Sequence, residues 1–472
     1  MLFNTVLFAA FFIAFFAVFE FVTRSRVQKL WCITVASVIF YAVSDYRFVP
    51  LLLGTALLDF YIAREIQRHD SNEPLRKRLL VFSIVANLSV LAIFKYADFG
   101  VSSAFGLLAA LGVNMKAPVF DIALPAGISF YTFQSMSYTI DVYRRELQAR
   151  ERPIEFLAGV TFFPHLVAGP IIRASTLLPQ FEKIAPRSWS SVQKAFLLIG
   201  TGLLNKTIAD HLAEPAAQAF SKEASFSSLE CWTGVLAFAG QVYGDFAGYT
   251  DIAIGVALLL GFVVPINFNL PYIATSPSDF WRRWHISLST WLRDYLYLPM
   301  CGESGRVYTA LFLTMLLGGV WHGAKWTFVA WGAYHGLLLV LEHVASSRLP
   351  DGRMPGPAWA VTTAQRVFTF YLVLIGLALF RSDTISQAWT IVRGMHVASV
   401  PSVWTYNATL TLGLVVAALP VMHLASYASQ RIGERVEREG TTSGWMVWPM
   451  VVNYLAIAMV FSKGNAFIYF QF

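Results

Sequence analysis

The chain has 472 residues, of which 56% are hydrophobic and only 13% are charged, whereas soluble domains carry roughly 25% charged residues. The mean hydropathy is +0.56. A single soluble core of this length needs more polar surface than 35 Lys and Arg and 28 Asp and Glu can supply. The composition therefore excludes a soluble enzyme, a disordered chain and a nucleic-acid-binding protein, and it predicts an all-α polytopic membrane protein.

Apolar runs that could form helical membrane spans follow one another along the chain. They occupy residues 2–22, 30–44, 48–63, 79–97, 122–141, 192–210, 231–262, 307–320, 326–344, 367–380, 408–428 and 443–463. Several are shorter than the ~20 residues of a perpendicular crossing, so we expect broken, tilted or re-entrant helices beside about 11–12 spans. The run 155–172 contains Pro164, His165 and Pro170, which is typical of a re-entrant or interfacial segment.

The distribution of positive charge predicts an orientation. When the spans alternate, most Lys and Arg residues fall on one side, in segments such as 64–78, 144–194 and 264–306. The positive-inside rule then places the N-terminus outside the cytoplasm, and twelve crossings place the C-terminus there too. The run 2–22 has no preceding basic region and no small-residue cleavage site, so we expect a first span rather than a signal peptide.

His322 lies where an apolar segment reaches paired glycines, Gly318 and Gly319, with Gly323 directly after it. An ionisable side chain at membrane depth is costly and is a functional-site candidate by default. A neutral imidazole in an apolar pocket is also a suitable general base for a hydroxyl near pH 7. The alternative is a buried histidine with a purely structural role.

His285 lies in an unusual polar stretch, residues 279–297, that is rich in tryptophan and arginine. If the stretch is one helix, Trp281, His285 and Leu288 share one face. Guanidinium groups beside tryptophans suit an anionic, partly aromatic ligand such as a nucleotide cofactor. An interfacial helix with snorkelling arginines explains the pattern equally well. The candidate binding residues are Trp281, Trp284, Arg282, Arg283 and Arg293.

Other residues carry weaker signals. His165 follows Pro164, and a turn histidine that hydrogen bonds to the backbone is the favoured interpretation. The three cysteines lie far apart, and no set of His, Cys and Asp has metal-ligand spacing. We therefore expect neither a disulfide framework nor a metal site.

Five stretches of the sequence resemble the membrane-bound O-acyltransferase family. They are Pro164–Ile172, Gln241–Gly255, Asn267–Tyr272, Asp279–Pro299 and Leu316–Gly336. They lie in order over roughly residues 120–345, and the most similar branch is the bacterial alginate O-acetyltransferase type, beside peptidoglycan O-acetyltransferases and teichoic acid D-alanyl transferases. The resemblance implies one integral-membrane domain over residues 1–472, with further spans and an aromatic tail in 362–472.

The resemblance also implies a fold and a reaction. It implies a ring of tilted helices around a central funnel in a bacterial inner membrane. The family's invariant histidine matches His322, and its second conserved polar position matches His285. The implied donor is cytoplasmic acetyl-CoA, a substrate rather than a bound cofactor. The acyl group then passes through a periplasmic SGNH-type, hydrolase-like partner to an exported polysaccharide such as alginate, cellulose or peptidoglycan.

Roles for the matched residues follow from this reaction. His322 would take a proton from the acceptor hydroxyl, and His285 would orient the donor or stabilise the oxyanion as a hydrogen-bond donor. Arginines of residues 282–293 would meet the CoA phosphates on the inner face; this assignment is our own inference and not a family motif.

Two other functions stay open at this point. The same machinery could transfer D-alanine from a carrier protein. A proton-coupled transporter would also place histidines in the membrane, but it predicts inverted repeats, and none is evident in the sequence.

The C-terminal segment 467–472 is rich in Phe and Tyr. An interfacial aromatic belt that anchors the last helix is one explanation. Related cell-envelope acyltransferases often end in such a tail, and this resemblance makes Tyr469 a candidate for a covalent acyl relay towards the periplasm.

Overall fold

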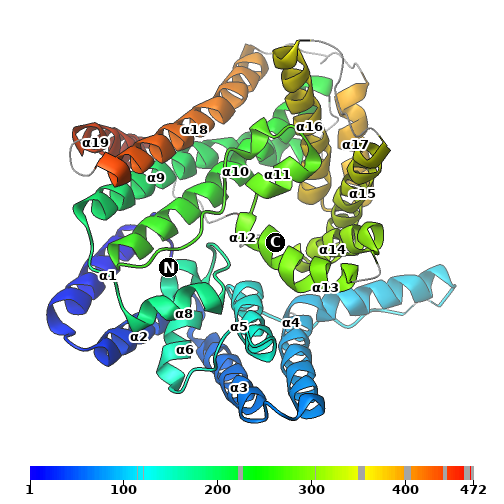
Figure 1. Ribbon diagram of the computed structural model, residues 1–472. Coiled ribbons are helices and arrows are strands. Elements are labelled where there is room, and N and C mark those ends of the chain that lie inside the picture. The colour runs from blue at the N-terminus through cyan, green and yellow to red at the C-terminus, as the bar shows by residue number, and fades with distance from the viewer. Residues whose placement is uncertain are drawn as a thin grey trace. The chain divides into compact units, whose positions relative to one another are not determined.

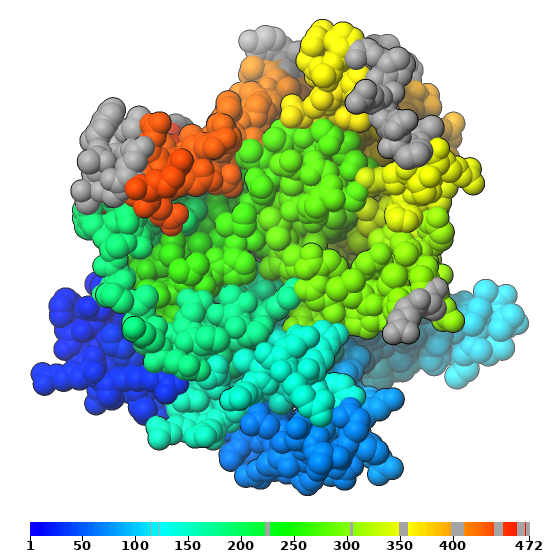
Figure 2. Space-filling model, viewed as in Figure 1, coloured from blue at the N-terminus to red at the C-terminus, as the bar shows by residue number. Residues whose placement is uncertain are grey.

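The computed structural model describes residues 1–113, 115–120, 122–221, 227–302, 305–348, 357–397, 406–439, 444–461 and 468. Within these residues the secondary structure is entirely helical, as the composition predicts. The chain divides into two compact units, residues 1–187 with 256–265, and residues 188–255 with 266–472. In Figure 2 the first unit is coloured blue to cyan-green, apart from its green segment 256–265, and the second unit is green to red.

The first unit contains eight α-helices and two short helices of other types among its described residues, besides the last turn of α10. They are α1 (Val6–Ala17), η1 (Val18–Val22), α2 (Arg26–Asp45), η2 (Tyr46–Phe48), α3 (Val49–Arg68), α4 (Glu73–Ala110), α5 (Ile128–Tyr143), α6 (Pro153–Val160), α7 (Phe163–Leu166) and α8 (Ala174–Glu182). The run 155–172 is thus broken into short helices, as predicted for a segment with this proline and glycine content.

A buried polar network joins α3, α4 and α5, which lie side by side (Figure 1). The Asp59 carboxylate accepts hydrogen bonds from Ser83 Oγ at 2.6 Å and from Asn87 Nδ2 at 2.8 Å. Ser83 Oγ also lies 3.0 Å from Thr139 Oγ1 of α5. Polar contacts of this kind hold helices together where the surrounding lipid offers no alternative partners.

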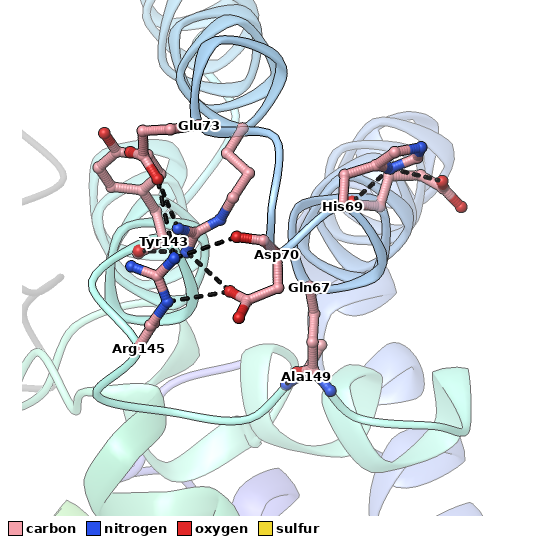
Figure 3. Close-up of polar contacts among 9 residues, drawn as sticks. Gln67, His69, Asp70, Glu73, Tyr143, Arg145 and Ala149 are labelled. Atoms are coloured by element: carbon pink, nitrogen blue, oxygen red, sulfur yellow. Dashed lines mark hydrogen bonds and ion pairs between the residues drawn. The ribbon is translucent and has the colours of Figure 1, made fainter.

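A second polar cluster joins the ends of the same helices (Figure 3). Arg145 Nε lies 2.9 Å from Asp70 Oδ1 in the α3–α4 turn. The buried Arg76 guanidinium contacts Glu73 at 2.7 Å and donates to the Tyr143 carbonyl at 2.6 Å. Residues of 64–78 and 144–194 therefore meet at one end of this unit, as the orientation argument requires of segments on the same side of a membrane.

The second unit contains the remaining helices. They are α9 (Trp189–Ala219), α10 (Ser228–Leu259), η3 (Pro271–Ile273), α11 (Pro277–Arg283), α12 (Ile286–Leu292), η4 (Arg293–Tyr297), α13 (Leu298–Cys301), α14 (Val307–His322), α15 (Trp326–Arg348), α16 (Ala358–Arg381), α17 (Ile385–His396), α18 (Tyr406–Glu439) and α19 (Gly444–Phe461). Helix α9 packs against both α18 and α19 (Figure 1). Small polar pairs, such as Thr201 Oγ1 and Ser429 Oγ at 2.5 Å, fix the contact with α18.

Six helical stretches in the described part of the chain are long and apolar enough to cross a membrane. They are Arg26–Arg68, Glu73–Ala110, Ser228–Leu259, Trp326–Arg348, Ala358–Arg381 and Leu410–Arg438. Three shorter apolar helices are Val6–Val22, Val307–His322 and Val447–Met459. The polytopic all-α class is thus confirmed. The predicted runs 30–44 and 48–63 lie in α2 and α3, which are joined through the extended residue Asp45 and the short helix η2. The number of crossings stays a prediction.

Candidate active site

The site is built on an unusually close contact between α14 and α15 (Figure 1). A Cβ atom on Gly319 would lie 2.4 Å from the Phe328 carbonyl oxygen, and one on Gly332 would lie 2.6 Å from the Met315 carbonyl oxygen. Only glycine lets the two backbones approach to this distance. Because His322 is the last residue of α14, this contact determines where its imidazole lies.

Aromatic rings surround His322. The rings of Trp321, Trp331 and Phe380 lie edge-on to the imidazole, with centroids 5.0, 5.0 and 5.1 Å away. His322 is 7% exposed and lines a narrow pocket with a cavity volume of about 20 Å³. The other lining residues are Val242, Phe280, Trp284, Trp331, His335, Val373, Leu377 and Phe380. The predicted combination of a histidine with an apolar pocket is therefore present.

His335 is a pocket residue that the sequence analysis missed. It lies on α15, and its ring is 4.9 Å from Trp331 and 5.3 Å from Trp281. A Cβ on Gly376 of α16 would lie 2.5 Å from His335 Nε2, so a glycine again makes room for an imidazole. The signal was present in the sequence, because Gly336 follows His335 as Gly323 follows His322.

The expectation of one helix over residues 279–297 is wrong, because the helix is broken at His285. This residue adopts a left-handed backbone conformation, with φ 43° and ψ 53°, and separates α11 from α12. Trp281, His285 and Leu288 therefore do not share the face of one helix. A non-glycine residue in this region of backbone space is uncommon, and such conformations concentrate at functional sites.

Asn267 determines the polarity of the His285 ring. Asn267 Oδ1 accepts a hydrogen bond from the Ser287 backbone N–H at 3.1 Å, which identifies this atom as oxygen because an N–H can only donate. His285 Nδ1 lies 3.2 Å from the same oxygen and must donate to it. In the neutral ring Nε2 is then an acceptor. The sequence led us to expect a hydrogen-bond donor at His285, whereas this geometry favours Nε2 as a hydrogen-bond acceptor.

Burial keeps the His285 ring neutral. The side chain is 0% exposed, and burial lowers the pKa of His285 to about 3. Phe246 lies edge-on to the imidazole at 4.7 Å and extends the apolar surroundings. His285 therefore carries no charge between pH 5 and pH 8.

One tryptophan connects the two predicted histidines. The Trp321 ring centroid lies 6.3 Å from that of His285 and 5.0 Å from that of His322. The structure therefore brings both histidines beside a single indole. They come from segments far apart in sequence, as a composite site requires.

The two tryptophans near His285 differ in position. Trp284 lines the His322 pocket and stacks on Phe280 at 5.6 Å. Trp281 packs edge-on against Trp331 and His335. The Glu342 carboxylate accepts a hydrogen bond from the Ser278 N–H at 2.8 Å and so fixes the start of α11. Trp284 is thus part of the pocket wall, whereas Trp281 packs against two of the lining residues, Trp331 and His335.

The three arginines differ in how far neighbouring carboxylates neutralise them. Arg293 Nε lies 2.6 Å from Asp294 Oδ1, and Arg283 Nε lies 3.0 Å from Asp279 Oδ1. The Arg282 side chain is 70% exposed, and its Nε is 3.9 Å from Asp279. Among these three, Arg282 has the weakest ion pair and the most accessible guanidinium for a phosphate.

His165 and Tyr469 are the other two residues that the sequence singled out. His165 is buried, and its Nε2 lies 3.1 Å from the Gly159 carbonyl oxygen, which confirms the expected bond to backbone, although the residue lies in the short helix α7 rather than in a turn. Tyr469 lies outside the described residues, although Ile468, directly before it, is described.

Several known proteins are similar to this chain in sequence. A family model described as membrane-bound O-acyltransferase matches residues 143–380. A probable alginate O-acetylase AlgI of Azotobacter vinelandii is 39% identical over 84% of this chain and 78% of its own length. The peptidoglycan O-acetyltransferase of Helicobacter pylori is 34% identical over 84% of this chain and 80% of its own. The teichoic acid D-alanyltransferase of Streptococcus thermophilus is 29% identical over 56% of this chain and 69% of its own.

The α14–α15 contact predicts the effect of adding one methyl group. Gly319→Ala places a Cβ against the Phe328 carbonyl, so the helices must separate and His322 must move. We expect the acyl-transfer rate to fall about tenfold or more, because a displacement of ~1 Å can cost up to 10²-fold. Gly100→Ala is the matched control, since nothing lies within 4 Å of its Cβ position. Equal transfer rates in the two variants would contradict this account.

Proposed function

This chain belongs to the membrane-bound O-acyltransferase family, and we propose that it acetylates an exported cell-envelope polysaccharide in a bacterial inner membrane, with cytoplasmic acetyl-CoA as the donor. That it is a multi-pass membrane O-acyltransferase follows from the family and from its apolar helices. The single observation that carries the proposal is the buried His322 imidazole inside an aromatic-walled pocket.

The relatives favour acetyl over D-alanyl transfer. The two proteins named for O-acetylation match 84% of this chain, whereas the D-alanyltransferase matches 56% with lower identity. Alginate and peptidoglycan are the polymers in those names, and cellulose is a third candidate of the same class. D-Alanine from a carrier protein is the alternative donor group.

The proposed chemistry uses His322 as the general base. Its imidazole takes the proton of the acceptor hydroxyl as the oxygen attacks the thioester carbonyl. The tetrahedral intermediate collapses, the carbon–sulfur bond breaks, and the CoA thiolate receives the proton from the imidazolium. The edges of Trp321, Trp331 and Phe380 exclude water from this step, which keeps the thioester from hydrolysis.

The proposed role of His285 is that of a positioning acceptor. Asn267 holds Nδ1, so Nε2 can accept a hydrogen bond from the incoming hydroxyl or from the donor's amide groups. His335 shapes the opposite wall of the pocket beside Trp331. Neither residue needs to change its protonation state during transfer.

The remaining parts of the proposal concern the route across the membrane. The C-terminus would lie in the periplasm, as would the N-terminus. Tyr469 would accept the acyl group as a phenyl ester, which is more reactive than an alkyl ester, and pass it to the serine of an SGNH-type periplasmic partner. A covalent relay divides one long transfer into two shorter ones.

We expect membranes that contain the protein, the SGNH-type partner and the polysaccharide acceptor to transfer label from radiolabelled acetyl-CoA to the polysaccharide, and His322→Ala to abolish this transfer. The matched control is His343→Ala, which removes an exposed histidine on α15. Thermal unfolding of both variants checks that the fold survives. A rate for His322→Ala within about tenfold of wild type, or ~1.4 kcal/mol of barrier, would remove the residue from catalysis. Transfer of D-alanyl but not acetyl groups would favour the alternative donor.

The pH dependence of kcat/KM should distinguish the role of His285 from that of His322. A pKa of about 3 keeps His285 neutral at every pH above 5, so the acid limb of kcat/KM belongs to another group. His285→Asn retains a residue that tolerates left-handed backbone but lacks the Nε2 acceptor. We expect this variant to lower the plateau value of kcat/KM about tenfold or more, without moving the pH midpoint of the acid limb. A shifted or missing midpoint would show that His285 itself titrates.

Ion pairing predicts unequal effects among the arginines. Arg282→Ala should raise the KM for acetyl-CoA about threefold to tenfold with little change in kcat, because phosphates bind away from the reacting carbonyl. Arg293→Ala should have a smaller effect, since Asp294 already neutralises its guanidinium. The KM is measured at two salt concentrations, because added salt screens an exposed contact. An unchanged and salt-independent KM for Arg282→Ala would exclude a phosphate site there.

A further inference from the structure

A buried cluster of charged side chains lies in the second unit, between α9 and α10. Lys206 Nζ is 2.5 Å from Asp210 Oδ1 and 3.0 Å from Asp245 Oδ1. The three side chains are 6%, 3% and 4% exposed. Charged groups buried inside a membrane-spanning stretch are expensive, and none of these residues takes part in the mechanism above.

The contact between the two helices holds this cluster in place. A Cβ on Gly248 would lie 2.5 Å from the Gly202 carbonyl oxygen, and one on Gly244 would lie 2.8 Å from the Asn205 carbonyl oxygen. The backbones of α9 and α10 therefore touch on both sides of Asp245. The close helix contact therefore restricts where the Asp245 carboxylate can lie.

The charge balance of the cluster favours an added hydrogen-bond donor. Two carboxylates face one ammonium group, so the three ionised side chains together carry one negative charge. A buried carboxylate is stabilised only when donors occupy its oxygens. Lys206 contacts Oδ1 of Asp245, which leaves Oδ2 to a donor from elsewhere.

That donor comes from the C-terminal end of the chain. The backbone N–H of Ile468 donates to Asp245 Oδ2 at 2.6 Å, across 223 residues of sequence. The Ile468 residue is only 1% exposed. Hydrogen bonds to an ionised acceptor are short and about twice as strong as neutral ones. An interfacial anchor would not need a backbone amide buried against a carboxylate.

We propose that the Lys206–Asp210–Asp245 cluster is the docking site for Ile468 near the C-terminus, and that Asp245 positions this part of the chain for acyl transfer. The second half of the proposal rests on the proposed function, because Ile468 precedes the candidate relay residue Tyr469. Asp245 is a positioning residue: it holds the segment and touches no reacting atom.

Hydrogen exchange of the Ile468 amide tests the docking directly. In the full-length protein we expect slow exchange, and in Asp245→Ala exchange at least tenfold faster, because the acceptor is gone. Asp251→Ala is the matched control, because it removes a half-buried carboxylate elsewhere on α10. Unchanged exchange in a folded Asp245→Ala would overturn the docking site. Should that variant fail to fold, Asp245→Asn keeps the side-chain shape and should give a smaller increase in exchange.

A second pair of variants tests positioning without altering the buried cluster. Ile468→Pro removes the donating N–H itself, whereas Ile468→Val keeps it in a β-branched side chain of similar shape. We expect Ile468→Pro to lower polysaccharide acetylation at least tenfold, with acetyl-CoA affinity unchanged, and Ile468→Val to stay within twofold of wild type. Wild-type acetylation by Ile468→Pro would overturn the positioning role.

The two measurements separate this inference from the proposed function. If wild-type protein transfers no acetyl group from acetyl-CoA, the proposed function fails, while slow Ile468 exchange that depends on Asp245 still supports the docking site. If transfer occurs but exchange at Ile468 is fast in wild type, the docking site fails and the proposed function stands.

Discussion

The close approach of α14 and α15 is the constraint on which the candidate site depends. Gly319 and Gly332 bring the two backbones into contact, and the same contact places His322 at the end of one helix beside Trp331 on the other. His335 reaches the pocket from α15 because Gly376 on α16 makes room for its ring. Gly332 thus acts on His322 through the backbone of α14, whereas Gly376 makes room for the His335 ring itself.

The two histidines share an apolar environment but differ in how they are held. His322 is surrounded mainly by ring edges, whereas His285 is fixed through Asn267 in one tautomer. A single acceptor oxygen, identified by the Ser287 amide, therefore changes the interpretation of His285 from hydrogen-bond donor to acceptor. The left-handed backbone at His285 supports this arrangement, since it turns the chain between α11 and α12 and brings Ser287 to the same oxygen.

The sequence predicted the helical membrane class, the broken segment near His165 and the apolar pocket around His322. Hydropathy and glycine spacing are local properties, so these features could be recognised without a structure. The break at His285 could not, because Asn267, a residue 18 positions away, stabilises it. His335 could not be placed from the sequence, because the room for its ring comes from Gly376 on another helix. The cluster of Lys206, Asp210 and Asp245 depends on the packing of α9 against α10, which a hydropathy pattern does not contain.

The central claim is that the His322 imidazole acts as the base inside an aromatic-walled pocket. Replacing it with glycine leaves a ring-shaped cavity bounded by Trp321, Trp331 and Phe380, and apolar cavities of this kind bind small aromatic molecules. Chemical rescue is therefore the most direct measurement: acetyl transfer by His322→Gly with added imidazole, and with pyrrole as a ring of similar size that lacks a basic nitrogen. The account predicts that imidazole restores transfer in proportion to its neutral form and that pyrrole does not. A folded, donor-binding His322→Gly variant that imidazole fails to rescue would contradict it.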